Sequence, residues 1–563
     1  MSTQSSDRPA TRPLERLGFT ALVLLTLAPV ALQGLWRPIA HASQVETDSL
    51  RLAIAALVVA IAALLACATR SANRRLSIAC AALAALLFGP LLGRGLPAIV
   101  AISAALLGVA ILCGALAPWL VRRLPAQLDG LAARRKGVTA LMLVLGVLTV
   151  TMTTRLGVYM GDKTRPELSL APDVPFMVHH SCLSAYVEGT RLAGAGVDNL
   201  YADEHWPHLG GSPGAAASGA PYAPFVLDTY AYPPPFMLLP RVVLTPLGEF
   251  ASQRAVWFTI NGLLIAAGLW IVATWIGGRA RVRALLLAPL LWISAPLAFT
   301  LQIGNVHALV VVAVMLALVA FETRRPALGG ALLAFAVVAK ISPGLLVLVL
   351  LLQRRFREVL WTAAWGLALA LAGLAVFGLA PYEAFLTHEL PRLSSGEALS
   401  FLALPESVPI NAAPFGIPFK LATIGVDVGD PWKIGKIINQ VFTVALLVVT
   451  VLAARRGGGR RAQAEVWAAL MTLASLRSPF APGYVLFSLL WLLSLRAVEV
   501  RGAVQTGVAV VVWIAMSNPL PGGGAPTLIA SLFQQALMFG VLAHALLRKP
   551  PGDDPPCPEG QPA

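Results

Sequence analysis

Charged residues are scarce in this chain of 563 residues, since Asp, Glu, Lys and Arg together make up 12% of it. A soluble domain usually carries about a quarter charged residues, so the composition excludes an ordinary water-soluble fold. Cysteine is rare as well: there are five, and their irregular spacing argues against a disulfide framework or a zinc site. No His-x-x-x-His or Cys-x-x-Cys pattern occurs. We therefore expect no metal site and no cofactor.

Apolar residues dominate what is present. The hydrophobic fraction is 57%, the mean hydropathy is +0.76, and the net charge is +15. The positive charge is split into clusters that abut apolar runs, which is the pattern of cytoplasmic loops in membrane proteins. Such clusters bind membrane lipids with anionic head groups, whereas a nucleic-acid footprint gathers on one surface of a folded domain, so we expect no nucleic-acid partner. The clusters are Arg8-Arg12-Arg16, Arg70-Arg74-Arg75, Arg122-Arg123 with Arg134-Arg135-Lys136, Arg279-Arg281-Arg283, Arg324-Arg325, Arg354-Arg355-Arg357 and Arg455-Arg456-Arg460-Arg461.

The apolar runs predict an all-α polytopic membrane protein of about 16 transmembrane segments, because a span needs roughly 20 apolar residues. The first segment resembles a signal peptide, but its apolar run exceeds the usual length of about 7–15 residues, so we interpret it as an uncleaved helix. With a cytoplasmic amino terminus, every Arg cluster then lies inside. The expected segments are 17–36, 50–69, 76–93, 97–121, 137–158, 254–276, 284–301, 306–322, 327–339, 344–353, 358–380, 434–454, 463–477, 480–495, 502–518 and 525–546.

Two large loops, 159–253 and 381–433, are then extracytoplasmic, and the first is rich in acidic residues. Within the first loop, the Gly/Ala/Ser run 209–221 predicts a flexible lid. The Pro-rich run 233–248 predicts a juxtamembrane helix instead of a span. Segments 327–339 and 344–353 are too short to cross alone, so we expect a bent hairpin around Lys340-Ile341-Ser342-Pro343.

Asp173 and Lys340 are the strongest candidates for chemistry. A carboxylate just above an apolar bundle can accept a proton, although an aspartate between prolines is also a common turn residue. A lysine at membrane depth costs roughly 2.5–3.5 kcal/mol, so it usually marks a function or a partner. Its ammonium suits a phosphate, but a side chain that snorkels to the interface explains it equally well.

Polar residues interrupt the apolar helices at one further place. Gln302-Ile303-Gly304-Asn305, followed by His307, breaks a helix pair, and such amides bind sugar hydroxyls or bond neighbouring helices. His179 and His180 in the first loop lack a third ligand at a spacing that suits a metal.

In their order along the chain, these residues resemble glycosyltransferase family 87, a family of GT-C membrane glycosyltransferases that includes polyprenyl-phosphate-mannose-dependent mannosyltransferases. The resemblance covers about residues 137–500. The family often has a His-Tyr pair after its Ser-Pro turn, whereas this chain has Gly483-Tyr484, so His179, His180 or His307 would have to replace that histidine, or the choice of donor differs. The matching residues are Asp173, Tyr230-Ala231-Tyr232-Pro233-Pro234, Gln302 to Asn305, Lys340 to Pro343, Asn411 and Ser478-Pro479-Phe480.

The resemblance implies a GT-C-like bundle in the plasma (inner) membrane, with an active site on the extracytoplasmic face. A hexose, expected to be mannose, would move from a polyprenyl-phosphate sugar donor to a lipid or glycan acceptor by an inverting displacement without metal. Asp173 would be the base. The expected contacts are Lys340, Arg392 and Lys420 for the donor phosphate, and His179, Tyr232, Gln302, Asn305, Asn411 and Tyr484 for the sugar or acceptor.

A transporter or flippase of lipid-linked saccharides is the alternative, but it predicts polar residues at both mouths of the bundle. A scaffold of a cell-envelope assembly complex would leave Lys340 unexplained. The expected organisation is a disordered cytoplasmic amino terminus (1–16), a transmembrane extension (17–121), the glycosyltransferase core (137–500), carboxy-terminal segments (501–546) and a disordered cytoplasmic tail (547–563).

Overall fold

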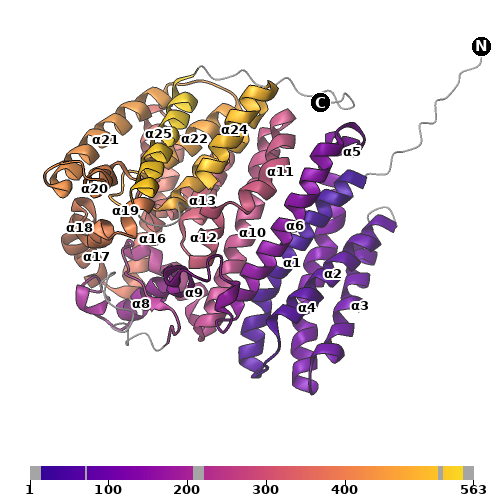
Figure 1. Ribbon diagram of the computed structural model, residues 1–563. Helices are drawn as coiled ribbons and strands as arrows, with labels where there is room; N and C mark the ends of the chain where they lie inside the picture. Colours follow the sequence, from indigo (N-terminus) through magenta and orange to yellow (C-terminus); the bar gives the residue numbers. More distant parts are fainter. Residues whose placement is uncertain (1–13, 70–72, 207–220, 518–523, 549–563) are drawn as a thin grey trace, which may run out of the picture. The chain divides into compact units, whose positions relative to one another are not determined.

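The computed structural model describes residues 14–69, 73–206, 221–517 and 524–548 (Figure 1). The expected lid at 209–221 and the two expected disordered ends lie almost entirely outside these residues. The chain divides into two compact units, one ending at Asp162 and the other beginning at Lys163. Each is described by itself.

The first unit is a set of antiparallel apolar helices. Its close packing depends on small residues: a Cβ on Gly114 of α4 would come within 2.6 Å of the Ile78 Cα atom of α3. Helix α6, with which the expected core 137–500 begins, packs against α1 in this unit. The elements are α1 (Leu14–Ser43), α2 (Ser49–Thr69), α3 (Arg74–Leu92), α4 (Leu96–Arg123), η1 (Ala126–Leu128), α5 (Leu131–Arg134) and α6 (Lys136–Gly161).

The second unit combines long helices with many short elements. Its long loops hold η2 (Pro166–Leu168), α7 (Pro175–His179), β1 (His180–Ser181), α8 (Cys182–Gly194), η3 (Asp203–His205), β2 (Val226–Leu227), η5 (Pro234–Met237), α9 (Leu238–Val243), η6 (Thr245–Leu247), α17 (Ala380–Ala384), η7 (Phe385–Glu389), α18 (Leu390–Ser395), η8 (Glu397–Ala403), α19 (Ser407–Ile410), η9 (Pro414–Gly416) and α20 (Ile417–Thr423). Its remaining elements are α10 (Phe250–Ile276), α11 (Gly278–Trp292), α12 (Ala295–Ile303), α13 (His307–Glu322), α14 (Pro326–Ala339), α15 (Gly344–Leu352), α16 (Phe356–Phe377), α21 (Pro431–Ala454), α22 (Arg460–Ser475), η10 (Gly483–Val485), α23 (Leu486–Arg496), η11 (Ala497–Glu499), α24 (Gly502–Ser517) and α25 (Ala525–Leu547).

The helical, polytopic character of the chain is confirmed, whereas the count of about 16 segments stays a prediction. Among the described residues, nine helices are long and apolar enough to cross a membrane, or ten if the bent pair α11 and α12 counts as one span. Every expected segment overlaps a helix, although 284–301 is divided between α11 and α12 and 480–495 becomes α-helical only at Leu486. The other six expected segments correspond to α13, α14, α15, α22, α23 and α24, which have 9 to 16 residues each. These helices are too short to be counted as spans by length, although their apolar runs suggested it.

The two expected irregular segments are where the sequence places them. The chain leaves α14 at Lys340, whose backbone is extended (φ −151°, ψ 129°), and α15 begins after Pro343. The run 233–248 forms only short helices, the longest being α9 with six residues, which is too short for a membrane span.

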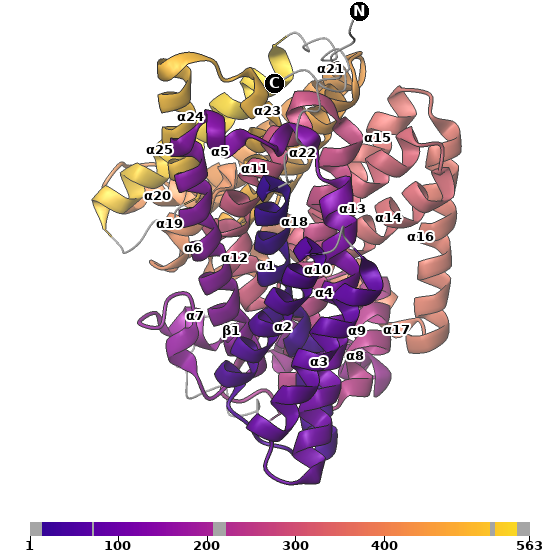
Figure 2. The same cartoon turned by 90° about the vertical axis from the view of Figure 1, so that its right-hand side faces the viewer.

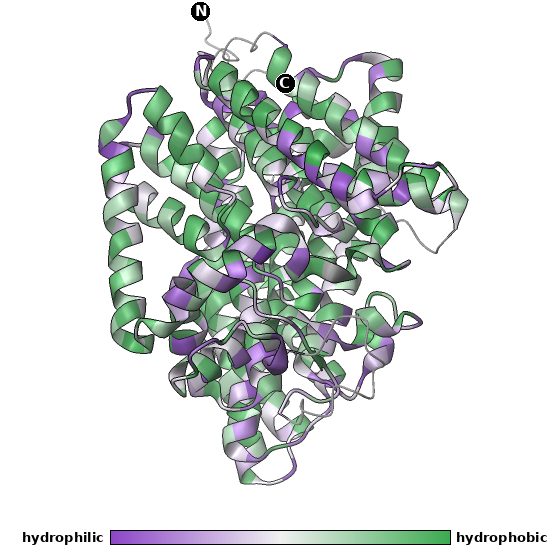
Figure 3. Ribbon diagram, turned by 90° about the vertical axis from the view of Figure 1, so that its left-hand side faces the viewer, coloured by the Kyte–Doolittle hydropathy of each residue, from purple (hydrophilic) through white to green (hydrophobic). Residues whose placement is uncertain are grey.

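The long helices expose apolar side chains. On α16, which packs beside α14 (Figure 2), Leu360, Leu367 and Leu371 are 69%, 61% and 54% exposed. Hydrophobic residues dominate the helices of both units (Figure 3). Apolar surface of this extent is unfavourable in water and favourable against lipid tails, which agrees with a membrane protein.

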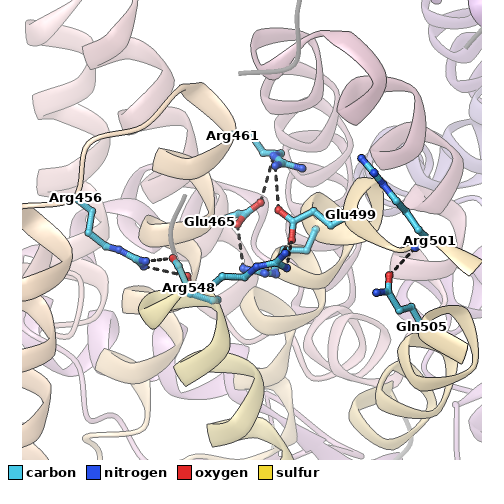
Figure 4. A network of polar contacts seen from close by, with 9 residues as sticks. Arg456, Arg461, Glu465, Glu499, Arg501, Gln505 and Arg548 are labelled. Carbon is cyan, nitrogen blue, oxygen red and sulfur yellow. Dashed lines mark hydrogen bonds and ion pairs between the residues drawn. The ribbon is translucent and has the colours of Figure 1, made fainter. Parts of the chain in front are cut away.

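A network of charges ties together the ends of α22, α23 and α25 (Figure 4). Glu499 accepts from Arg461 (3.0 Å), Arg496 (3.0 Å) and Arg548 (3.3 Å). Glu465 pairs with Arg461 and Arg496 at 3.5 and 3.2 Å. Two carboxylates thus hold three guanidinium groups that come from α22, α23 and the end of α25.

Candidate functional site

The first large loop is pinned by a two-stranded parallel sheet. His180 of β1 pairs with Val226 of β2, and Ser181 pairs with Leu227. The next residue of each strand is therefore brought opposite its counterpart, which places Cys182 beside Asp228. The Ser184 hydroxyl reinforces this register, because it donates to the Val226 carbonyl (3.2 Å) and accepts from the Asp228 N–H (3.0 Å).

The turn between α12 and α13 presents an amide to the same place. Gly304 adopts a left-handed conformation (φ +72°), which a side chain would strain, and its carbonyl accepts from the Trp257 indole (2.8 Å). The Asn305 side-chain oxygen accepts from the His307 N–H (2.9 Å) at the start of α13. The Asn305 Nδ2 atom is thereby fixed and free to donate away from the helix.

Three side chains converge on that amide nitrogen. Asn305 Nδ2 lies 3.3 Å from Cys182 Sγ, 3.5 Å from the Tyr232 hydroxyl and 3.4 Å from the Tyr484 hydroxyl. The Tyr232 hydroxyl also lies 3.0 Å from that of Tyr186. Burial raises the pKa of the Tyr232 phenol well above its usual value, so it remains a neutral hydrogen-bonding group. The expected residues Tyr232, Asn305 and Tyr484 are therefore brought together.

Lys340 joins this group from the break between α14 and α15. Its Nζ atom lies 5.0 Å from the centre of the Tyr484 ring, a cation–π contact. It makes no hydrogen bond or ion pair with any residue in the described part of the chain. The His307 ring also lies beside Tyr484, with the two ring centroids 5.4 Å apart. Both nitrogens of this buried imidazole lack a hydrogen-bond partner within the described ranges.

Gln302 holds the segment that carries Asp173. The Gln302 side-chain oxygen accepts from the Leu170 N–H (2.7 Å), and its Nε2 atom donates to the Met177 carbonyl (2.6 Å). Asp173 lies between these two anchoring points. Its side chain is exposed and contacts no polar group of a described residue. The amide of Gln302 thus positions a loop, and neither of its ends is free for a sugar.

Asn411 and Lys420 of the second large loop are buried and bonded to protein groups. Asn411 donates to the Pro479 carbonyl (2.9 Å) and accepts from the Ala413 and Ala481 N–H groups (3.0 Å each). Lys420 donates to the Asn411 carbonyl (2.7 Å), and burial lowers the pKa of its ammonium to about 7. These contacts brace the Ser-Pro turn that precedes Tyr484.

Two other expected residues make contacts at the protein surface. Arg392 donates to both carboxylate oxygens of Asp203 (2.8 and 3.0 Å) and lies 2.8 Å from the His388 ring nitrogen. His179 Nδ1 lies 3.1 Å from the Pro224 carbonyl. None of the recorded contacts of these two residues is with the group around Asn305.

Sequence reasoning missed Cys182, Tyr186 and Asp228. Cys182 had no metal-binding spacing, and Asp228 stands in a run of polar loop residues that gives no periodic signal. The signal that points to them is the pairing of β1 with β2, which joins residues 46 positions apart. Two strands of two residues each are too short to be recognised from the sequence.

An apolar helical bundle with amides, phenols and an unpaired ammonium at helix breaks fits a membrane enzyme that acts on a polar, lipid-borne group. The model of glycosyltransferase family 87 matches residues 230–479, which confirms the family resemblance inferred from the sequence. This stretch contains Tyr232, the 302–305 turn, Lys340 and Asn411. The match supports a membrane glycosyltransferase in general. No curated protein and no solved structure matches the chain.

Proposed function

We propose that this chain is a GT-C-type glycosyltransferase of the plasma membrane. It moves a hexose, with mannose as the favoured sugar, from a polyprenyl-phosphate donor to a lipid or glycan acceptor on the extracytoplasmic side. The family match supports the reaction class, and the exposed apolar helices provide a surface for the prenyl chain. The acidic first loop, which carries Asp173, would receive the acceptor.

The observation that carries the proposal is the state of Lys340. An ammonium at a helix break is costly at membrane depth, yet this one has no carboxylate or carbonyl partner in the described ranges and lies over the Tyr484 ring. A donor phosphate supplies the missing negative charge. As the phosphate leaves, its charge grows, and a fixed ammonium then stabilises it most strongly.

The reaction is a single displacement. The acceptor hydroxyl oxygen bonds to the anomeric carbon, the bond from that carbon to the phosphate oxygen breaks, and its electron pair leaves with the polyprenyl phosphate. The hydroxyl proton passes to the Asp173 carboxylate. Attack from the face opposite the leaving group inverts the anomeric configuration. The Gln302 clamp across residues 170–177 supports this role, because a base must be held within hydrogen-bond reach of its proton.

We assign the sugar to His307 and Tyr484, with Asn305 as a contact that would have to exchange its bonds to Cys182, Tyr232 and Tyr484. His307 has two unpaired ring nitrogens beside Tyr484, so it is the best placed of the three histidines that we considered as replacements for the family histidine. Asn411, Lys420 and Arg392 already bond to protein groups. Direct contact of these residues with the donor would require those bonds to open.

A transfer assay with purified protein in detergent, polyprenyl-phosphate mannose and membrane-extracted acceptor lipid tests the proposal. Lys340→Met keeps the length of the side chain and removes its charge. Losing charge-assisted hydrogen bonds of about 1.5–3 kcal/mol should weaken donor binding about 10- to 150-fold. The matched control is Lys433→Met, which alters an exposed lysine of the second loop. If Lys340→Met leaves donor affinity and turnover unchanged, Lys340 does not bind the donor, and its ammonium would simply extend to the membrane interface.

Asp173→Asn tests the base in the same assay. It removes proton acceptance and preserves shape, so turnover should fall roughly 10²–10⁴-fold while the donor still binds. Asp162→Asn, at the end of α6, should remain active. An active Asp173→Asn protein would show that another group takes the proton.

A further inference from the structure

Three side chains that bind metals meet where the first loop is pinned. His180 Nε2 lies 3.4 Å from Cys182 Sγ and 3.6 Å from Asp228 Oδ2. All three donor atoms lie within 4.8 Å of one another. The parallel pairing of β1 with β2 creates this grouping, because it sets Cys182 opposite Asp228 with His180 two residues before the cysteine.

The way in which the His180 imidazole faces its two neighbours excludes a proton relay of the Cys-His-Asp type. A relay needs the thiol on one imidazole nitrogen and the carboxylate on the other, as in hydrolytic triads. Here the sulfur and the carboxylate oxygen both face Nε2 of His180. Three donor atoms that face a common point are the arrangement expected of ligands around a cation.

Each of the three groups is held by a further contact. Phe176 stacks on the His180 ring, with centroids 4.4 Å apart and planes 17° apart. The Thr229 N–H donates to Asp228 Oδ1 (2.9 Å), which leaves Oδ2 toward the histidine. Asn305 Nδ2 lies 3.3 Å from the Cys182 sulfur and is placed to stabilise a thiolate. Such outer contacts orient the ligands of protein metal sites.

We propose that His180 Nε2, Cys182 Sγ and an Asp228 carboxylate oxygen bind a zinc-type divalent cation. Mixed sulfur, nitrogen and oxygen donors suit Zn²⁺, whereas Mg²⁺ and Ca²⁺ prefer oxygen alone. The ion takes the place of the thiol proton, which is released to solvent, so thiolate and carboxylate together balance its two positive charges. Three protein ligands leave a fourth position for water or substrate.

The cation site lies beside the group to which we assign the transfer reaction. Only the role given to the cation depends on the proposed function; its binding does not. Asn305 contacts both the Cys182 sulfur and the Tyr484 hydroxyl, and Lys340 lies over the Tyr484 ring. A cation bound here therefore stands beside the group that we assign to the sugar and the donor phosphate. It would fix the first loop against the 302–305 turn, a structural role that leaves the displacement itself free of metal.

Metal content of the purified full-length protein tests the site without any assay of activity. After incubation with Zn²⁺ and removal of free metal, elemental analysis should find about one zinc per chain. The site variants His180→Ala, Cys182→Ser and Asp228→Asn should lose it. The matched controls are the neighbouring His179→Ala and, for the thiol, Cys67→Ser in the first unit; both should retain the metal. Asn305→Ala, which removes an outer contact, should weaken zinc binding about 10–100-fold.

Loading the site with Co²⁺ in place of Zn²⁺ tests directly whether the Cys182 thiolate binds the metal, which loss of metal from a misfolded variant would not show. Co²⁺-loaded protein should show a thiolate-to-cobalt charge-transfer band that disappears in Cys182→Ser and persists in His179→Ala. Wild-type protein without stoichiometric zinc, or site variants that keep it, would overturn the proposal. The two proposals fail separately: Asp173→Asn should lose transfer activity and keep its zinc, and a metal-free protein that still transfers the sugar refutes only the metal site.

Discussion

Replacing Asn411 by alanine shows whether this residue stabilises the fold by bonding backbone groups or binds the sugar directly. The Asn411 side chain is 2% exposed and makes three hydrogen bonds, one to the Pro479 carbonyl and one from each of the Ala413 and Ala481 N–H groups. Alanine leaves all three buried backbone groups unpaired. At about 1 kcal/mol or more for each unpaired group, the free energy of unfolding should fall by at least roughly 3 kcal/mol.

The matched control is Asn261→Ala in α10. Asn261 is equally buried (3% exposed), but its amide makes one bond, to the Trp257 carbonyl four residues earlier, and its oxygen has no partner in the described ranges. Its removal should cost about 1 kcal/mol or less, because that carbonyl keeps its helical bond. Unfolding of both variants by denaturing detergent, together with the donor KM, measures the difference. An Asn411→Ala protein that is as stable as Asn261→Ala, with a raised KM, would refute the brace and restore a sugar contact.

Two further predictions concern pH and topology. Burial raises the pKa of Glu389 from 4.5 to about 7, against the opposing charge of Arg392, so folding favours the protonated form of this carboxyl group. Its contribution to the free energy of unfolding should be greatest below pH 4.5 and should fall by about 3 kcal/mol as the pH rises through 7. Glu389→Gln should abolish that slope when unfolding is measured as a function of pH. In a background without native cysteines, Glu204→Cys in the first loop should react with an impermeant maleimide in intact cells, whereas Thr323→Cys beside Arg324 should react only after lysis; the reverse pattern would invert the proposed topology.

The sequence predicted the positions of the helices well, because a long apolar run in a chain with few charges has few other stable conformations at membrane depth. Even the short runs 344–353 and 463–477 form helices, α15 and α22, close to the expected bounds. Apolar composition alone does not show whether helices of this length cross the membrane, so the count of about 16 segments stays a prediction. The breaks were easier to predict, since Gly304 ends α12 in a left-handed conformation and Pro343 lies in the gap before α15, where a helix cannot easily continue.

The candidate site was predicted only in part. Tyr232, Asn305, Lys340 and Tyr484 come together as the family order suggests. The closeness of Cys182 to Asp228 depends on a strand pairing that no local pattern signals. Residue type alone also does not show whether an amide faces a ligand or the protein's own backbone.

That last distinction follows from the physics of helix breaks in an apolar bundle. Where a helix stops at membrane depth, freed N–H and C=O groups have no water to bond, so nearby amides must satisfy them. Gln302 and Asn411 each use both ends of the side chain on backbone groups. Gln302 bonds Leu170 and Met177 of the first loop, and Asn411 bonds Pro479 and Ala481 around the Ser-Pro turn. Lys340 and His307 stand at similar breaks but satisfy none of those groups in the described part of the chain. The proposed donor would supply partners for these two groups, which both lie beside Tyr484, so donor binding should depend on Lys340 and His307.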